Sequence, residues 1–236
     1  MNLPDGNTIS AAEHTMSLLS ALSRNVHEGH LGLMKGEWNR HQLVGNELKD
    51  KTIGIVGLGK IGREVMKRAL SYDMNVIGHD PFVNQEMFDP DTIKIVDIDY
   101  LTTESDFITV HVPLIDATRD LFDINRLKMM KPSSRIINVA RGGIINEKDL
   151  SVALNDGIIA GAAIDVFVKE PIENDHPFLS TKNLLITPHL GASTVEAKEG
   201  VSKGICEQVK DYLLDQKMSN VLNIPIADMS LSLIHI

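Results

Sequence analysis

Three residues with the chemistry of a catalytic site follow strand-like segments: Arg141, Glu170 and His189. A guanidinium can hold a carboxylate through two parallel hydrogen bonds. An imidazole titrates near neutrality and can take up or release the proton of a hydroxyl group. A carboxylate beside an imidazole favours its charged form and fixes its tautomer. These residue types indicate a site that holds a small acid and interconverts its alcohol and ketone.

Each of these assignments has a structural alternative. Arg141 precedes two glycines and would look the same as a surface arginine in a constrained turn. The chain has nine histidines, and a single histidine such as His111 or His189 is more often structural than catalytic. Asp165 also follows a strand-like run. It could accept a hydrogen bond from a nicotinamide carboxamide, or it could cap a loop.

The second chemical feature is the segment "KTIGIVGLGKIG" at residues 51–62, where an apolar strand runs into a glycine-rich turn and a helix. Gly57, Gly59 and Gly62 have the spacing G-x-G-x-x-G. The first permits a tight turn, the second lets the backbone approach a pyrophosphate, and the third allows the helix to pack on the strand. The helix N-terminus then faces the anion.

A helix pattern and a second strand, "NVIGHD", follow and end at Asp80. A carboxylate at this point can accept both hydroxyls of an adenosine ribose and would repel a 2′-phosphate. The pattern therefore predicts NAD rather than NADP. The alternative is that Asp80 only begins a turn before Pro81.

Short β-rich runs alternate with helical ones from residue 51 to about residue 190, which is typical of a doubly wound parallel sheet with helices on both faces. In such a sheet ligands bind beyond the carboxyl ends of the strands, where His111, Arg141, Asp165, Glu170 and His189 all stand. The predicted fold class is therefore α/β and Rossmann-like.

Two long helices flank this alternation. The first is expected to run through residues 11–36 after a cap at Asn7, Thr8 or Ser10. Its wide apolar stripe suggests packing against more than its own sheet, with a partner subunit as the candidate, and consists of Met16, Leu18, Leu19 and Leu22. Trp38 follows in a polar stretch and needs a pocket in its own chain or in a neighbour. The second helix is expected from Ser193, with the lone cysteine, Cys206, at a buried apolar position.

Composition excludes several classes. With 236 residues, 43% hydrophobic and 23% charged, the chain has an ordinary globular composition and could form one or two domains. No apolar run approaches the roughly 18 residues of a membrane span, and no signal peptide is recognised, so a cytoplasmic protein is expected. A net charge of −9 argues against nucleic-acid binding. The cysteine count and spacing support neither a disulfide nor a metal site.

Six segments in order resemble the D-isomer-specific 2-hydroxyacid dehydrogenase family: "NTISAAEH", "GLGKIG", "ITVHVPL", "NVARGGIINE", "DVFVKEP" and "PHLGASTVEA". The resemblance implies an NAD-dependent enzyme acting on a small 2-hydroxy or 2-keto acid, and a homodimer formed through the NAD-binding domain. It implies that Arg141 binds the substrate carboxylate, His189 is the acid/base and Glu170 is its carboxylate partner. The cofactor contacts it implies are Gly57, Gly59, Lys60, Ile61, Gly62, Asp80, Val112, Val139, Ala140, Arg141, Asp165, His189, Gly191 and Ala192.

The resemblance also predicts a division of the chain. Residues 1–8 would be a remnant of a substrate lobe and its crossover, 9–190 the NAD-binding domain, and 191–228 a helix and segment returning to that lobe. Residues 229–236 no longer follow the family. Because most of the lobe is expected before residue 1, an NAD-sensing interaction module and an inactive cofactor-binding domain remain alternatives to an enzyme.

Overall fold

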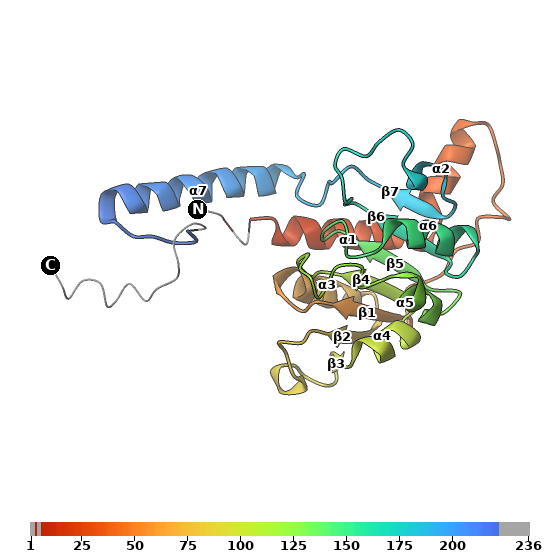
Figure 1. Ribbon diagram of the computed structural model, residues 1–236, viewed down its shortest axis with the longest axis horizontal. Helices are drawn as coiled ribbons and strands as arrows, with labels where there is room; N and C mark the ends of the chain where they lie inside the picture. The colour runs from red at the N-terminus through yellow and green to blue at the C-terminus, as the bar shows by residue number, and fades with distance from the viewer. Residues whose placement is uncertain (1–2, 4–5, 222–236) are drawn as a thin grey trace. The chain divides into compact units, whose positions relative to one another are not determined.

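The structure is a computed structural model that describes residue 3 and residues 6–221 (Figure 1). It divides into two compact units, one formed by Thr8–Gly191 and the other by residues 1–7 and 192–236. The tail expected at 229–236 and the end of the segment at 191–228 lie outside the described residues. In the part that is described, no helix combines the length and apolarity needed to cross a membrane.

The larger unit is built on a seven-stranded sheet in the order β3-β2-β1-β4-β5-β6-β7, and every neighbouring pair is parallel. This order reverses between β1 and β4, which is the switch point at which ligands bind in doubly wound sheets. The predicted fold class is confirmed. The strands are β1 (Thr52–Val56), β2 (Asn75–His79), β3 (Lys94–Ile95), β4 (Phe107–Val110), β5 (Arg135–Asn138), β6 (Gly161–Ile164) and β7 (Leu184–Ile186).

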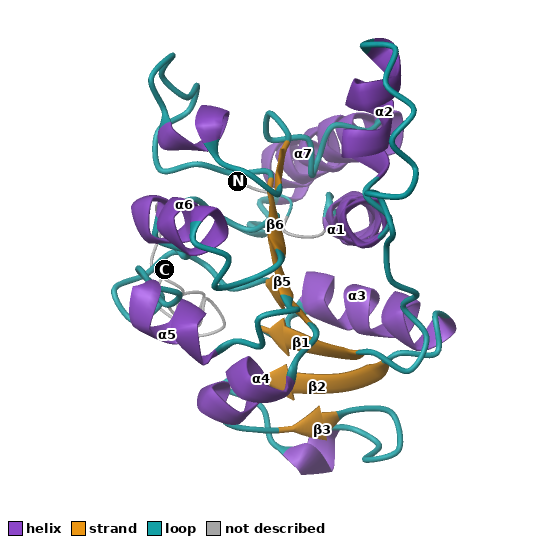
Figure 2. Ribbon diagram, turned by 90° about the vertical axis from the view of Figure 1, so that its right-hand side faces the viewer, coloured by secondary structure: helices purple, strands orange, loops and turns teal. Residues whose placement is uncertain are grey.

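Helices cover both faces of the sheet, with α4, α5 and α6 on one side and α1 and α3 on the other (Figure 2). The helices of this unit are α1 (Thr8–Ser23), α2 (Val26–Met34), α3 (Lys60–Ser71), α4 (Ile98–Glu104), α5 (Ile124–Met129) and α6 (Glu147–Asn155), with short 3₁₀ turns η1 (Gln85–Met87) and η2 (Pro177–Ser180). The other unit contains α7 (Val195–Asp215).

The sequence explains both faces of this core. The central strands are buried on both sides, so they are nearly continuous in apolar residues, as in the fully buried β4. Leu101, Leu127 and Leu150 pack on one face from α4, α5 and α6, whereas Leu19 and Val65 pack on the other from α1 and α3. Helices α4, α5 and α6 are capped by side chains that accept hydrogen bonds from backbone N–H groups, namely Asp97, Asp123 and Asn146.

The first long helix differs from the prediction of one uninterrupted element. Asn25 takes the left-handed conformation with φ of 52°, and the chain therefore divides into α1 and α2. The stripe of Met16, Leu18, Leu19 and Leu22 is buried within the chain itself. It packs on α3 and the sheet, and so gives no reason to expect a partner subunit at that face.

One apolar surface that the described residues leave uncovered lies on α2 and the segment after it. No residue of α2 is buried. Met34 is 75% exposed and Trp38 is 77% exposed, so the described chain supplies no pocket for the tryptophan.

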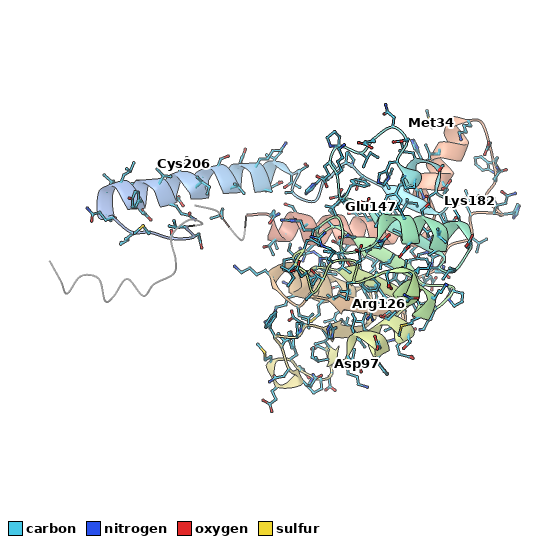
Figure 3. All side chains as sticks on the ribbon, viewed as in Figure 1. Met34, Asp97, Arg126, Glu147, Lys182 and Cys206 are labelled. Carbon is cyan, nitrogen blue, oxygen red and sulfur yellow. The ribbon has the colours of Figure 1, made fainter. Side chains whose placement is uncertain are left out.

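The second long helix begins one residue later than expected, because Thr194 rather than Ser193 caps it by accepting from the Ala197 N–H at 3.1 Å. Cys206 is exposed, which corrects the expectation of a buried position (Figure 3). Periodicity placed Cys206 on the apolar face of α7, and within the described residues Leu213 and Leu214 on the same helix are also 72% exposed.

Candidate functional site

The glycine-rich turn has the geometry that its spacing predicts. Gly57 has φ of 95°, and a Cβ there would lie 2.7 Å from the carbonyl oxygen of His111. A Cβ on Gly62 would lie 2.0 Å from the carbonyl oxygen of Gly57. Both positions exclude a side chain because backbone approaches backbone, so α3 is held directly against the end of β1.

Gly59 differs from these two glycines because a Cβ there would meet nothing within 4 Å. Packing within the chain therefore does not require a glycine at position 59. It leaves open space at the N-terminus of α3, where the first N–H groups of the helix have no acceptor within it. This open space at a helix N-terminus fits the pyrophosphate of a dinucleotide.

Asp80 is joined to the same turn. Its Oδ2 accepts from the Leu58 N–H at 2.8 Å, and its Oδ1 accepts from the Phe82 N–H at 2.9 Å. Each carboxylate oxygen keeps a second lone pair, so the bonds to the backbone orient Asp80 without exhausting its capacity to accept ribose hydroxyls. Arg63, which sequence reasoning missed, braces the turn from the helix side through Nε donating to the Leu58 carbonyl at 2.9 Å.

Arg141 stands on a turn that is clamped by Asn138, the last residue of β5. The Asn138 side chain donates to the Arg141 carbonyl at 2.8 Å and accepts from the Ala140 N–H at 2.9 Å. Asn138 is only 2% exposed and was not singled out from the sequence. The sequence signal that could have identified it is an asparagine at the end of a strand-like run, three residues before Arg141.

The turn of Arg141 lies directly against the loop that carries Glu170. A Cβ on Gly142 would lie 2.0 Å from the carbonyl carbon of Phe167, so only glycine permits this approach. The Arg141 side chain is exposed and donates from Nη1 to the Ala140 carbonyl at 2.6 Å. Its remaining donors are therefore able to meet a ligand.

His189 and Glu170 form the pair that the sequence suggested. His189 Nδ1 lies 2.6 Å from Glu170 Oε2, and Glu170 Oε1 accepts from the Phe167 N–H at 3.0 Å. Burial is the largest single influence and raises the pKa of the Glu170 carboxyl, but the hydrogen bonds from His189 and the Phe167 N–H outweigh it and leave that pKa lowered. An ionised Glu170 fixes the tautomer with hydrogen on Nδ1 and leaves Nε2 as the reactive nitrogen.

Arg141, Glu170 and His189 meet around one cavity of about 270 Å³. It is completed by Leu114, Gly142, Val166, Phe167 and Val168. A second cavity of about 390 Å³ lies on the β7 side of the His189–Glu170 pair and is lined chiefly by apolar residues: Phe167, Pro171, Ile172, Ile186 and Pro188. The arrangement can hold a carboxylate at the guanidinium and exchange a proton at the imidazole.

Asp165 has the loop-capping role that was one of its two alternatives. The residue is fully buried, and its carboxylate accepts from the Leu190 N–H and the Gly191 N–H, both at 2.8 Å. Thr187 Oγ1 donates to it at 2.5 Å. Burial is the largest influence and raises the Asp165 pKa, but these hydrogen bonds together with that from His14 lower it, so the carboxylate is charged. Contact with a nicotinamide stays a prediction.

His111 stands at the end of β4 but has no part in the acid/base pair. Its Nε2 lies 2.9 Å from Thr109 Oγ1, and burial lowers the pKa of the imidazole to about 4. His111 is therefore neutral near neutral pH. Its carbonyl packs against Gly57, so its place is structural.

The remaining cofactor positions fall into two groups. Val112 packs beside Gly57, where a Cβ would lie 2.8 Å from Val112 Cγ1, and Lys60 and Ile61 form the first turn of α3. Val139 packs beside Gly191, where a Cβ would lie 2.9 Å from Val139 Cγ1. Ala140 belongs to the Arg141 turn. Ala192 begins the second stretch of the other compact unit, and its role stays a prediction.

The chain is similar to several known proteins over most of its length. It is 42% identical over 225 residues to D-3-phosphoglycerate dehydrogenase of Synechocystis sp., covering 95% of this chain and 40% of the relative. It is 43% identical over 226 residues to D-3-phosphoglycerate dehydrogenase of Methanocaldococcus jannaschii, covering 95% of this chain and 43% of that protein. The chain therefore spans less than half the length of these curated relatives.

Among solved structures, the NAD-dependent formate dehydrogenase of Staphylococcus aureus in complex with NAD superposes with a TM-score of 0.84. The two are 35% identical, and the match covers 91% of this chain and 65% of that one. Residues 16–191 match the model of the family described as "D-isomer specific 2-hydroxyacid dehydrogenase, NAD binding domain". Together with the glycine-rich turn, the oriented Asp80 and the parallel sheet that carries them, this match shows that the chain belongs to the D-isomer specific 2-hydroxyacid dehydrogenase family and contains its NAD-binding domain.

Proposed function

We propose that this chain is the part of a D-2-hydroxyacid dehydrogenase that binds NAD and carries the residues for proton transfer and carboxylate binding. The observation that supports this best is the meeting of Arg141 with the His189–Glu170 pair around one cavity. A formate-oxidising relative releases carbon dioxide and has no hydroxyl proton to transfer, so the imidazole and carboxylate pair favours a hydroxy acid substrate.

In this proposal Arg141 binds the substrate carboxylate bidentately and so places the C2 hydroxyl near His189 Nε2. His189 takes the hydroxyl proton during oxidation and returns it during reduction. Glu170 accepts from Nδ1 and stabilises the imidazolium that forms. Bound NAD supplies the hydride chemistry at C2. Replacing His189 by alanine is expected to lower turnover by about 10² to 10⁴, the usual contribution of positioned acid/base catalysis.

The preferred substrate is 3-phosphoglycerate, oxidised to 3-phosphohydroxypyruvate as a step of serine biosynthesis. The segment "HLGASTVEA" at residues 189–197 and the D-3-phosphoglycerate dehydrogenases among the relatives support this choice. Arg141 is the only permanently charged cation that lines either described cavity, and it is assigned to the carboxylate. The phosphate would therefore need cations from elsewhere in the protein. Glyoxylate and hydroxypyruvate, which need none, are the alternatives.

A non-catalytic NAD-binding interaction module is the second candidate. The chain spans 40% of one curated relative, so a binding function without turnover is consistent with the present residues. The two readings differ at Arg141, because a module that senses only NAD has no use for a cation at the substrate position.

Calorimetric titration with NADH and NADPH, followed by oxamate, an unreactive 2-keto acid analogue, tests both parts of the proposal. We expect NADH to bind more tightly than NADPH, and Asp80→Ala to weaken NADH binding while narrowing that preference, because the carboxylate accepts from a diol and repels a phosphate. Equal binding of the two cofactors by the unaltered chain would contradict the role of Asp80.

Oxamate should then bind to the NADH complex of the unaltered chain and not to that of Arg141→Ala. Arg119→Ala, at an exposed arginine outside the cavity, is the matched control and should bind oxamate normally. The 236 residues alone are expected to turn over 3-phosphoglycerate barely, because an open cavity aligns substrate poorly. Oxamate binding that survives Arg141→Ala would favour the interaction module.

We also infer that the chain forms a homodimer through its NAD-binding domain and acts in the cytoplasm. The surface that supports a dimer, here called the α2 surface, consists of exposed apolar residues between residues 26 and 44. They are Val26, Leu31, Leu33, Met34, Trp38 and Val44, each at least 52% exposed. Monomers rarely expose such a run, and an exposed tryptophan is typical of an interface. A symmetric pair would cover this surface on both copies at once.

A further inference from the structure

His14 of α1 connects to the loop of His189 through a buried carboxylate. His14 Nε2 lies 3.2 Å from Asp165 Oδ1 and 3.3 Å from Thr187 Oγ1. The histidine side chain is 19% exposed, and that of Asp165 is fully buried. The two residues are 151 positions apart in the chain, so this is a tertiary contact between α1 and the end of strand β6.

Asp165 in turn holds three consecutive residues. Its carbonyl accepts from the His189 N–H at 2.9 Å, and its carboxylate accepts from the next two N–H groups, those of Leu190 and Gly191. His189 itself takes a left-handed conformation with φ of 56°. A non-glycine residue keeps this conformation only where the surrounding contacts determine it. The hydrogen bonds of Asp165 hold the His189 N–H and the N–H groups of the two residues that follow it.

The Asp165 carboxylate needs donors because it is charged and buried. Leu190 and Gly191 supply two, and Thr187 supplies a third. The fourth contact is that of His14 Nε2, which donates when the ring carries hydrogen on that nitrogen. Among the described residues it is the only donor from outside strands β6 and β7 and the loops that follow them. His14, Thr187 and Leu190 contact Oδ1, whereas Gly191 contacts Oδ2. Loss of the His14 contact therefore leaves Oδ1 with two donors and removes the contact that orients the carboxylate from α1, so the backbone that the carboxylate holds is less firmly placed.

We propose that His14 is a positioning residue: by donating to Asp165 it fixes residues 189–191 and so sets where the His189 imidazole stands relative to Arg141. The inference rests on the proposed acid/base role of His189. It predicts that the identity of residue 14 matters for the order of this loop although its side chain lines neither cavity.

Amide hydrogen exchange of the 236-residue chain, measured by NMR, tests the proposal without requiring turnover. In His14→Leu the amides of Leu190 and Gly191 should exchange about ten- to a hundredfold faster, the effect expected when a hydrogen bond to a charged group is lost. His14→Gln carries an N–H at similar reach and should restore slow exchange. Ser17→Ala, on the exposed side of the same helix, should leave both amides unchanged.

The His189 Nδ1 proton gives a second readout, because its hydrogen bond to Glu170 shifts its resonance downfield. That resonance should broaden or move upfield in His14→Leu and return in His14→Gln. If His14 only stabilised the fold as a whole, His14→Leu would also accelerate exchange of the β1 amides. If His14 positions the loop, exchange of the β1 amides should not change. If His14→Leu fails to fold, His14→Asn, whose amide is too short to reach Asp165, should accelerate the same two amides.

Unchanged exchange at Leu190 and Gly191 in His14→Leu, or in His14→Asn if His14→Leu does not fold, would overturn the proposal, as would acceleration spread equally through β1. Failure of NADH and oxamate to bind the unaltered chain would instead contradict the proposed function, and the exchange rates would still report whether His14 holds the loop.

Discussion

At the scale of single residues, similar side chains have separate tasks because their surroundings differ. Asp80 and Asp165 both follow strands, yet Asp80 is only partly buried and retains lone pairs for a ligand, whereas Asp165 is buried among four donors. His189 and His111 differ in the same way. His189 is paired with a carboxylate, whereas burial keeps His111 neutral.

The partly buried His111, whose imidazole is desolvated, is expected to make the domain sensitive to mild acid. Burial lowers its pKa in the folded protein from 6.5 to about 4, so the unfolded chain binds more protons between these values. The stability that follows from this pKa difference is fully present above pH 6.5 and is lost as the pH falls toward 4. The free energy of unfolding is expected to decrease by up to about 3 kcal/mol over this range.

Urea unfolding at a series of pH values checks this prediction. His111→Asn should flatten the dependence between pH 6.5 and 4 while leaving the loss at lower pH, which the Asp165 and Glu170 carboxylates cause. An equally steep dependence in the variant would show that other groups are responsible.

At the scale of elements, the β1-turn-α3 unit separates packing from binding at neighbouring glycines. Gly62 lies where a Cβ would be 2.0 Å from backbone, and Gly59 lies where a Cβ would meet nothing within 4 Å. Gly62→Ala should therefore lower the unfolding free energy by about 1 to 3 kcal/mol, because α3 must move away from β1.

Gly59→Ala is the matched comparison. Its unfolding free energy should change by less than about 0.5 kcal/mol, while its affinity for NADH falls because the new methyl group occupies the open space at the helix N-terminus. Urea unfolding and NADH titration of both variants measure the two effects. NADH affinity unaffected by Gly59→Ala would place the pyrophosphate elsewhere.

At the scale of the whole molecule, the α2 surface is an apolar surface of the larger unit that the described residues of one copy leave uncovered. Met34 and Trp38 together with their neighbours should be buried between two copies, so sedimentation of the unaltered chain should report a dimer. The paired change Met34→Ser and Trp38→Ala should give a monomer that still binds NADH. Val152→Ser, at a 47% exposed valine of α6, is the control and should remain dimeric. Dimers that persist in the double variant would move the interface to another face.

The sequence by itself determined the parts of this protein that depend on contiguous residues. Strand, glycine turn, helix and second strand follow one another from residue 51 to residue 80, and the spacing of Gly57, Gly59, Gly62 and Asp80 carries its own geometry. The meeting of Arg141 and His189 was also predictable, because the carboxyl ends of parallel strands share one edge of the sheet.

Only the tertiary structure decided what depends on residues far apart in the chain. Asp165 could have capped a loop or faced a ligand, and its hydrogen bonds from the Leu190 and Gly191 N–H groups show that it caps the loop, while contact with a nicotinamide stays a prediction. The break at Asn25 was hidden because apolar periodicity continues across it, and its left-handed backbone is a local conformation that periodicity does not record. Cys206 lay on an apolar pattern and Trp38 is a large aromatic residue in a polar stretch, but neither observation states whether another part of the protein covers the side chain. Burial depends on that cover, which the folded chain alone reveals.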